Sequence, residues 1–287
     1  MTPRRFLAAA VQLSSNSDAD ASTADAERLI RLGAERGARF IATPENTNFL
    51  GPHDQKVELA EPLEGPTCAR FADIAASCGI HLLLGSFNER AEGESQRCFN
   101  TSVLFGPDGA VLGVYRKMHL FDVDLNDEVR FFESATCVPG DEVSCVATGL
   151  ADFGLSICYD LRFPELYRQL LDRGAQVHCV PSAFTMTTGK DHWHVLLRAR
   201  AIETQCWVIA PAQCGEHDDQ GLRHSYGHSL IIDPWGTVRA EAGDEPGLAM
   251  AEIDLDQVAS TRRGLPMANH RRLAGNQVID PGSTGPG

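Results

Sequence analysis

The sequence predicts an α/β fold in which two β-sheets are covered by helices on their outer sides. Strand-like and helix-like segments alternate along most of the chain. Two turn signals, Gly106-Pro107-Asp108-Gly109 and Asp233-Pro234-Trp235-Gly236, each lie between short apolar runs and predict β-hairpins. Hairpins mixed with strand–helix units favour two layered sheets over a single doubly wound sheet.

The first half of the chain is expected to supply strand–helix units and one hairpin. Phe6–Gln12 is predicted to be a core strand, because the short apolar run after two arginines only faintly resembles a signal peptide. Asp18–Arg36 has its apolar residues at helical spacing and is predicted to be an amphipathic helix. The other elements expected here are strands at Arg39–Pro44 and Ile80–Phe87, a helix at Cys68–Ser77, and a hairpin of Thr101–Phe105 with Ala110–Tyr115.

The second half begins with a polar, mixed stretch after Lys117 and then returns to alternating elements. Pro164 suits the first turn of a helix that runs to about Arg173. We expect one domain over residues 1–275 and a flexible tail at 276–287, which is rich in Gly, Pro, Ser and Thr. The other expected elements are strands at Ala147–Leu150, Phe153–Ile157, Val177–Val180, Cys206–Pro211 and Leu248–Ile253, a hairpin of Ser229–Ile232 with Thr237–Ala240, and helices at His192–Thr204 and near Asp254–Arg263.

Composition excludes several classes of function. The chain has 287 residues, of which 43% are hydrophobic, so it can bury a large core. Its formal net charge is −14, and the basic surface that phosphate backbones require is missing. The sequence contains no run of about 18 apolar residues, so it predicts no membrane span. We therefore expect neither nucleic-acid nor membrane partners.

The nine cysteines indicate a reducing compartment. Their number is odd, and no two have C-x-x-C spacing, so neither a disulfide scaffold nor a common zinc motif is expected. Mostly buried free thiols in a cytoplasmic protein are the simplest interpretation.

Cys158 is the candidate nucleophile. It follows the predicted strand Phe153–Ile157 and precedes the helix that begins near Pro164. A strand-to-helix turn projects a thiol clear of the sheet and places backbone N–H groups where an oxyanion would form. A thiol becomes reactive only with a base or cation nearby, and taken alone a free cysteine is more often a buried structural residue.

Glu45 and Lys117 are candidate partners for that thiol. Glu45 directly follows an apolar strand and a proline, at a sheet edge where it could act as general base. Lys117 ends a hairpin strand, where its ammonium group could stabilise an oxyanion. Each residue alone is more often a solvated surface charge.

Three segments in order carry a resemblance to the nitrilase superfamily, the carbon–nitrogen hydrolases, from about Phe6 to Arg272. They are Thr43-Pro44-Glu45, Tyr115-Arg116-Lys117-Met118-His119-Leu120 and Ile157-Cys158-Tyr159-Asp160-Leu161-Arg162-Phe163-Pro164-Glu165. The resemblance implies a four-layer αββα sandwich and a Glu45–Lys117–Cys158 triad, with Glu133 as a second glutamate. It also implies a homodimer or larger oligomer that pairs through outer helices, and no metal or cofactor.

Within that family the later segments resemble the deaminated glutathione amidase branch. These segments are Pro181–Phe184, His192-Trp193, Leu196–Cys206, Ala212–Gly215 and Ser225–Ser229. The expected reaction is hydrolysis of a small carboxamide to a carboxylate and ammonia through a thioester. Omega-amidase activity on α-ketoglutaramate, or nitrilase or carbamoylase activity, are alternatives.

Arg162 is the best candidate for binding substrate. A guanidinium four residues after Cys158 could clamp a carboxylate, or it could instead form a structural ion pair with Glu165 or Asp160. The resemblance places Phe184 and Thr188 in the same pocket and implies that the Tyr159 backbone N–H helps to bind the oxyanion. Two segments depart from the family pattern and are expected to border the pocket: Leu125–Arg130 and Asn46-Thr47-Asn48, of which Asn48 is the candidate substrate contact.

Other classes of protein fit the sequence less well. Gly227-His228-Ser229-Leu230-Ile231 lacks the last glycine of a serine-hydrolase elbow, and Gly189-Lys190 lacks the rest of a phosphate-binding loop. The histidines at 192, 194, 217, 224 and 228 have no standard zinc spacing. A binding module that has lost its chemistry is the rival from another class, and the intact acidic, basic and thiol candidates argue against it.

Overall fold

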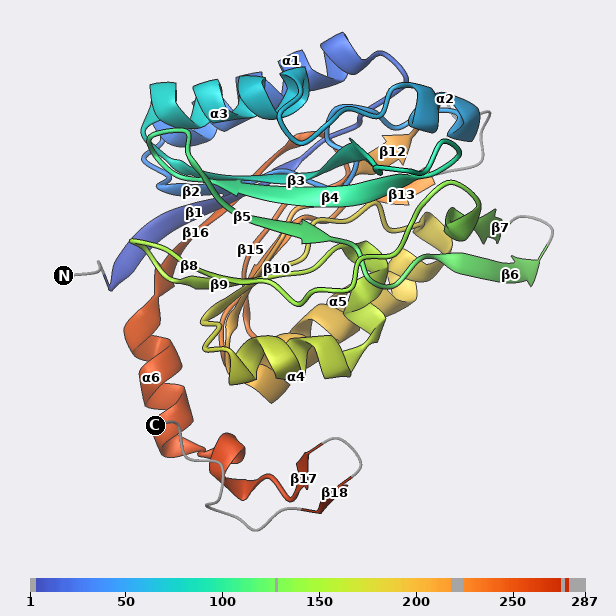
Figure 1. The fold of residues 1–287 in the computed structure, drawn as a ribbon. Helices are drawn as coiled ribbons and strands as arrows, with labels where there is room; N and C mark the ends of the chain where they lie inside the picture. Colours follow the sequence, from blue (N-terminus) through green and yellow to red (C-terminus); the bar gives the residue numbers. More distant parts are fainter. Residues whose placement is uncertain (1–3, 127–128, 218–223, 275–276, 279–287) are drawn as a thin grey trace.

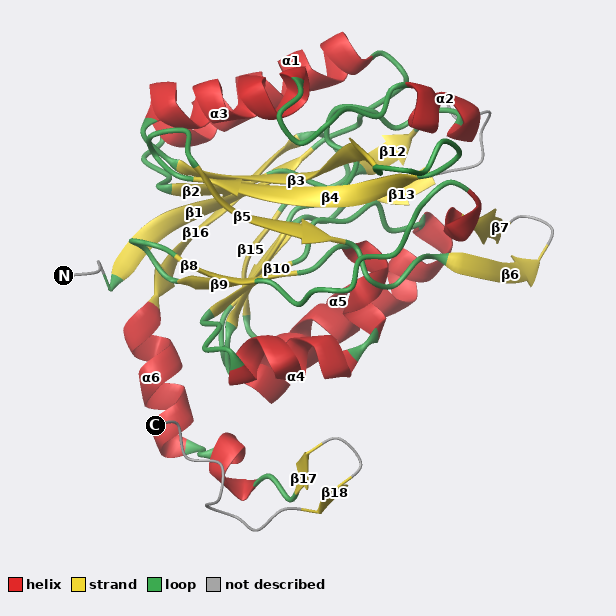
Figure 2. Cartoon of the chain, in the orientation of Figure 1, coloured by secondary structure: helices red, strands yellow, loops and turns green. Residues whose placement is uncertain are grey.

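The computed structural model describes residues 4–126, 129–217, 224–274 and 277–278. Two six-stranded sheets lie face to face between pairs of helices, as Figures 1 and 2 show. This arrangement confirms the predicted four-layer αββα sandwich.

The first sheet has the strand order β16-β1-β2-β3-β4-β5. Its three central strands are parallel and its remaining strands are antiparallel to their neighbours. The bounds are β1 Arg5–Gln12, β2 Phe40–Ala42, β3 His81–Arg90, β4 Cys98–Phe105, β5 Val111–Arg116 and β16 Gly247–Asp254. Helices α1 (Ala19–Glu35) and α3 (Pro66–Cys78) cover its outer face (Figure 1).

The second sheet repeats this plan, with the order β15-β14-β11-β10-β9-β8. Its strands β9, β10 and β11 are parallel, and the others are antiparallel. The bounds are β8 Cys145–Ala147, β9 Asp152–Leu155, β10 Val177–Cys179, β11 Trp207–Ala210, β14 Leu230–Ile232 and β15 Val238–Glu241. Helices α4 (Pro164–Asp172) and α5 (Met186–Thr204) cover its outer face (Figure 1).

Strand alternation explains why the sheets pack in this way. Successive side chains of a strand point to opposite faces. Along β1, Ala8 and Ala10 join the core between the sheets, while Ala9 and Val11 join the core beneath α1 and α3. The rings of Phe40 and Phe153 stack with centroids 4.2 Å apart and join β2 to β9. The parallel strands of both sheets are thereby buried on both faces, as parallel strands usually are.

Short elements complete the chain. They are α2 His53–Glu58, β6 Asp122–Asn126, β7 Val129–Phe132, β12 Cys214–Glu216, β13 His224–Tyr226, α6 Leu255–Gly264, β17 Leu273–Ala274 and β18 Gln277–Val278, with 3₁₀ turns η1 Glu133–Ala135, η2 Cys158–Arg162 and η3 Met267–His270. Of the expected flexible tail, only the two residues of β18 are described. No helix within the described ranges combines the length and hydropathy needed to cross a bilayer.

Two predicted elements were misplaced. The strand expected at Ala147–Leu150 lies instead at Cys145–Ala147, because Thr148 turns the chain: its hydroxyl accepts from Leu150 N–H at 3.1 Å and donates to the Ala151 carbonyl at 2.9 Å. Helix α5 begins at Met186, six residues before the predicted start. Its early glycine, Gly189, lies against the Tyr226 ring, where a Cβ atom would come within 2.4 Å of Tyr226.

Candidate active site

A buried lysine lies between two buried glutamates at one end of the sandwich. Lys117 Nζ is 2.9 Å from Glu45 Oε1 and 2.9 Å from Glu133 Oε2. The three side chains come from the segments that follow β2, β5 and β7, and each residue is at most 3% exposed. The structure therefore brings together three of the four residues for which catalytic roles are expected.

Electrostatics keep this cluster charged despite its burial. Burial lowers the pKa of Lys117, but the charges of Glu133 and Glu45 outweigh it and hold that pKa well above its usual value. Burial likewise raises the pKa of Glu133, yet the Lys117 and Lys56 charges lower it well below the ordinary carboxyl range. A buried ion pair persists only when its remaining hydrogen-bonding capacity is also satisfied.

Asn100 on β4 supplies part of that capacity. Its Nδ2 donates to Glu45 Oε1 at 2.8 Å and to Glu133 Oε1 at 3.3 Å, so one amide group holds both carboxylates. The backbone N–H of Phe121 donates to Glu133 Oε2 at 2.7 Å. Asn100 was not singled out from the sequence.

Cys158, the fourth residue, opens η2 shortly after strand β9 of the second sheet. Its φ angle is +49°, a left-handed conformation that costs a non-glycine residue energy and often marks a functional turn. Its thiol lies near enough to Glu45, Lys117 and the Ala183 backbone N–H for all three to act on its pKa. Burial and the nearby Glu45 charge raise the pKa of Cys158 well above its ordinary value, which keeps the thiol protonated.

Several contacts fix Glu45 beside that thiol. Ala183 N–H donates to Glu45 Oε2 at 2.9 Å, and Gln213 Nε2 donates to the Glu45 backbone carbonyl at 2.9 Å. The segment that leads to Glu45 passes close to β3 at Gly85. A Cβ atom at that position would lie 1.9 Å from the Thr43 carbonyl oxygen, so glycine is required there. The carboxylate is thus held from both sheets.

Asp160 ties the cysteine turn to the lysine segment. It is fully buried and accepts hydrogen bonds from Tyr115 Oη at 2.7 Å and from Ile157 N–H at 2.9 Å. Its other oxygen accepts from His119 N–H at 3.0 Å and contacts His119 Nδ1 at 2.7 Å. Asp160 is therefore occupied by these partners and is not the ion-pair partner of Arg162.

The segment from 7 to 263 matches the family model described as carbon–nitrogen hydrolase. This match spans most of the chain and includes every residue of the cluster. The chain belongs to the carbon–nitrogen hydrolase family. It is therefore a hydrolase that acts on non-peptide carbon–nitrogen bonds.

Curated relatives of this carbon–nitrogen hydrolase include amidases. A deaminated glutathione amidase from Synechocystis sp. is 45% identical over 268 residues, which are 93% of this chain and 98% of that protein. The Homo sapiens deaminated glutathione amidase is 43% identical over 94% of this chain and 84% of its own length. An omega-amidase from Xenopus tropicalis is 40% identical over 85% of this chain and 87% of its own length.

Solved structures share the fold. The Caenorhabditis elegans NitFhit protein matches with a TM-score of 0.89 and 37% identity; the match covers 95% of this chain but only 66% of that chain. Saccharomyces cerevisiae Nit3, described as a member of branch 10 of the nitrilase superfamily, has a TM-score of 0.83 and 33% identity over 94% of this chain and 97% of its own. A mutant amidase from Nesterenkonia sp. carries the acetamide moiety of fluoroacetamide on its active-site cysteine; it has a TM-score of 0.75 and 26% identity over 94% of this chain and 98% of its own.

Arg162 lies beside aromatic rings in this hydrolase. Its guanidinium is 5.2 Å from the ring centroid of Phe184 and 5.8 Å from that of Tyr159. Its hydrogen-bond partner is His192 Nδ1 at 3.2 Å, rather than Glu165, the other acid considered from the sequence. The side chain thus keeps donors available for an added carboxylate.

The other expected pocket residues divide into two groups. The ring centroids of Phe184 and Trp193 are 5.1 Å apart, and the hydroxyl groups of Thr188 and Thr185 are 2.9 Å apart. Phe184 and Thr188 therefore lie around the start of α5. Asn48 instead donates to Thr67 Oγ1 at 3.2 Å, at the start of α3. Its buried Oδ1 has no partner among the described residues. Of the departing loop Leu125–Arg130, residues 127–128 lie outside the described residues.

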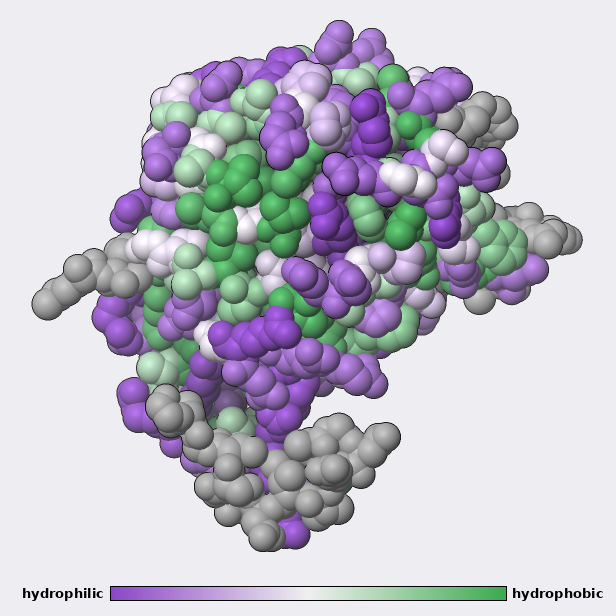
Figure 3. Space-filling view, in the orientation of Figure 1, coloured by the Kyte–Doolittle hydropathy of each residue, from purple (hydrophilic) through white to green (hydrophobic). Residues whose placement is uncertain are grey.

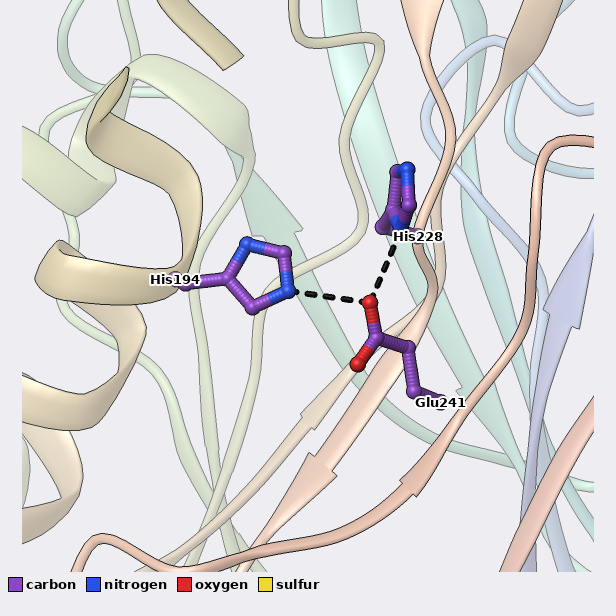
Figure 4. A group of neighbouring side chains, drawn as sticks. All are labelled: His194, His228 and Glu241. Atoms are coloured by element: carbon purple, nitrogen blue, oxygen red, sulfur yellow. Dashed lines mark hydrogen bonds and ion pairs between the residues drawn. The ribbon is translucent and has the colours of Figure 1, made fainter. Parts of the chain in front are cut away.

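The five histidines considered for zinc do not form one site. His217 is bound to the Ser15 carbonyl and the Ser225 hydroxyl, and His192 is bound to Arg162. Figure 4 shows His194 and His228 pointing at Glu241, whose Oε1 lies 3.0 Å and 2.8 Å from their ring nitrogens. The potential ligand atoms of these three side chains lie within 4.8 Å of one another. The hydrogen bonds account for this cluster, and no metal role is proposed for it.

Proposed function

We propose that the protein is a cysteine-dependent amidase that hydrolyses a small carboxamide, deaminated glutathione, to a carboxylate and ammonia. The observation that carries this proposal is the buried Glu45–Lys117–Glu133 cluster, with the Cys158 thiol beside it. Thiol, base and cation are the groups that nucleophilic acyl transfer requires.

The first half of the reaction forms a thioester. The Cys158 thiol is protonated at rest, so Glu45 takes its proton as sulfur attacks the amide carbon. Lys117 and the Tyr159 backbone N–H stabilise the oxyanion. Tyr159 is the second residue of η2, and the first N–H groups of a helical turn have no partner inside that turn. Glu45 then protonates the leaving nitrogen, and ammonia departs.

The second half returns the enzyme to its starting state. Glu45 takes a proton from water, and the resulting nucleophile attacks the thioester carbon. The tetrahedral intermediate expels the Cys158 thiolate, which takes back a proton from Glu45. The released carboxylic acid ionises, and its proton converts the ammonia to ammonium in solution. The net change is one amide and one water converted to one carboxylate and one ammonium ion. Glu133 holds Lys117 in place through both halves and balances its charge.

The proposed substrate contacts follow from charge and shape. Arg162 clamps the substrate carboxylate, and Phe184 and Tyr159 flank the clamp. Thr188 lines the same side of the substrate pocket. Asn48 contributes a hydrogen-bond acceptor, its unpartnered Oδ1. The identities of 45% and 43% to deaminated glutathione amidases support this substrate class.

Omega-amidase activity is the second candidate, since the Xenopus enzyme of that name is 40% identical. Ammonia release from deaminated glutathione and from α-ketoglutaramate, measured side by side, separates the two. Preference for deaminated glutathione supports the proposal, and preference for the shorter acid moves the protein to omega-amidase. The Cys158→Ala variant is the control: measurable steady-state turnover by it would exclude the proposed mechanism.

The protein is further proposed to be a homodimer or larger oligomer that pairs through its outer helices. Two exposed apolar residues of α5, Val195 and Ile202, are 66% and 45% exposed and lie seven residues apart on one helical face. Trp235 is 64% exposed, and its neighbour Gly236 lies against Ile202. Light scattering of the wild type and of Val195→Glu tests this: a wild-type monomer would refute it.

The remaining proposals concern location and domain organisation. We place the protein in the cytoplasm, as a single domain over residues 1–275. All nine cysteines are free thiols, which suits a reducing compartment.

Apolar side chains also gather on the surface over β4 and β5, as Figure 3 shows. Val111 and Leu112 of β5 are exposed.

A further inference from the structure

Two buried free cysteines, Cys98 and Cys137, lie opposite each other on neighbouring segments. We infer that Cys98 and Cys137 are a redox pair, which hydrogen peroxide converts to a reversible disulfide with Cys137 as the attacking sulfur and Lys56 as its activating cation. Neither cysteine takes part in the proposed amidase reaction, and this inference does not depend on that reaction.

The backbone places the two cysteines opposite each other. Cys98 N–H donates to the Thr136 carbonyl, and Val138 N–H donates to the Cys98 carbonyl, both at 2.9 Å, so Cys98 and Cys137 pair as neighbours in a parallel bridge. Neighbouring strands lie about 4.8 Å apart. A disulfide needs Cα atoms within about 4.4–6.8 Å, so this pair needs no large backbone movement. The two thiols are close enough for Cys98 to lower the pKa of Cys137.

A buried lysine lies against this pair of cysteines. Lys56 of α2 is 7% exposed, and its Nζ donates to Cys137 Sγ at 3.0 Å. Burial lowers the pKa of Lys56, but the charges of a Cys137 thiolate and of Glu133 outweigh burial and raise that pKa. In agreement, Cys98 and the Lys56 charge lower the pKa of Cys137 to about 6, despite burial and the Glu133 charge, which raise it.

The chemistry needs only a two-electron oxidant small enough to reach a buried site. The Cys137 thiolate attacks hydrogen peroxide, forming a sulfenic acid and releasing hydroxide. Cys98 sulfur then attacks the Cys137 sulfur, the S–S bond forms, and the Cys98 proton and the sulfenic hydroxyl leave as water. In sum, two thiols and one peroxide give one disulfide and two waters. A dithiol reductant reverses the change.

The bridge would join two segments that hold the amidase cluster. Cys98 lies two residues before Asn100 on β4, and Cys137 N–H donates to the Glu133 carbonyl at 2.8 Å. By contrast, Cys179 is also fully buried, but burial raises its pKa, and no cation within the described ranges is paired with it. Cys179 therefore provides a matched control.

Peptide mapping tests the inference. The full-length protein is treated with hydrogen peroxide at pH 7, quenched, alkylated in denaturant and digested. We expect a Cys98–Cys137 cross-linked peptide that dithiothreitol abolishes. In Cys158→Ala, which keeps eight of the nine cysteines, the number of alkylatable thiols should fall by two. The urea midpoint of the oxidised protein should rise, because a bridge restrains the unfolded chain.

Variants decide between this pair and other oxidation products. Cys98→Ser and Cys137→Ser should lose the cross-link and the midpoint shift, whereas Cys179→Ser should keep both. Lys56→Met should form the link about tenfold or more slowly, because less Cys137 is thiolate, and Lys56→Arg should restore the rate. A folded wild type in which Cys158 is oxidised while Cys98 and Cys137 stay unlinked overturns the inference. So does a Cys137–Lys56 adduct in place of the disulfide.

Discussion

The Tyr115 hydroxyl donates to Asp160 Oδ2 at 2.7 Å and thereby joins β5, which ends just before the catalytic lysine candidate, to the turn that carries Cys158. The hydrogen bond spans the two sheets. Asp160 therefore sets the separation between Lys117 and Cys158 without touching either side chain in any described contact. It is a positioning residue in the proposed mechanism.

Replacing Asp160 by Asn should weaken both the fold and catalysis. Tyr115, Ile157 and His119 all direct donors at the carboxylate, but an amide offers one acceptor oxygen. Leaving a buried donor unsatisfied costs about 1–3 kcal/mol, which urea unfolding would measure. We expect kcat to fall while KM changes little, because the lysine and the thiol lose their spacing. The exposed Glu165→Gln is the control, and equal losses in both variants would contradict the positioning role.

Asn100 offers a second test, because it donates to two carboxylates at once. Asn100→Leu keeps the approximate volume but removes both hydrogen bonds, so stability should fall by about 1–3 kcal/mol. Asn100→Asp keeps the shape and adds a third negative charge beside Glu45 and Glu133. It should therefore lower stability and activity more than Asn100→Leu does. Urea unfolding and ammonia release measure both effects. An Asp variant as stable and active as the wild type would refute this role.

Acid should weaken the protein partly through Glu133. Its folded-state pKa is lowered, from 4.5 to about 2, so its ionised form contributes stability that is fully present above about pH 4.5. That contribution is lost as the pH falls from 4.5 towards 2, and linkage puts its full size at about 3 kcal/mol. The difference in unfolding free energy between wild type and Glu133→Gln should therefore be large at pH 7 and narrow towards pH 3. If the difference in unfolding free energy does not change with pH, the lowered pKa of Glu133 is contradicted.

The sequence anticipated the fold class and most elements because their periodicity is local. Glu45, Lys117 and Cys158 could be singled out since each ends or follows a recognisable strand. Glu133 was found only through the family resemblance, because its surroundings show no clear period. Asn100 was missed because its meaning depends on Glu45, which is 55 residues away in the chain. The early start of α5 was missed because the Gly189 contact with Tyr226 is tertiary and overrides weak helix propensity.

Arg162 should discriminate acidic substrates from neutral ones. Its guanidinium lies over Phe184 and Tyr159 and is paired with His192, so the structure gives it no carboxylate partner in the described ranges. Arg162→Gln should lower kcat/KM for an amide that carries a carboxylate by about tenfold to a hundredfold, since a charge-assisted hydrogen bond contributes about 1.5–3 kcal/mol. A neutral primary amide of the same length should be hydrolysed at a nearly unchanged rate, because it cannot use the guanidinium. Arg168→Gln on α4 is the matched control and should affect neither substrate. Equal losses on acidic and neutral amides would assign Arg162 to structure instead, and Arg162→Lys should recover only part of the loss because an ammonium cannot bind a carboxylate in two places.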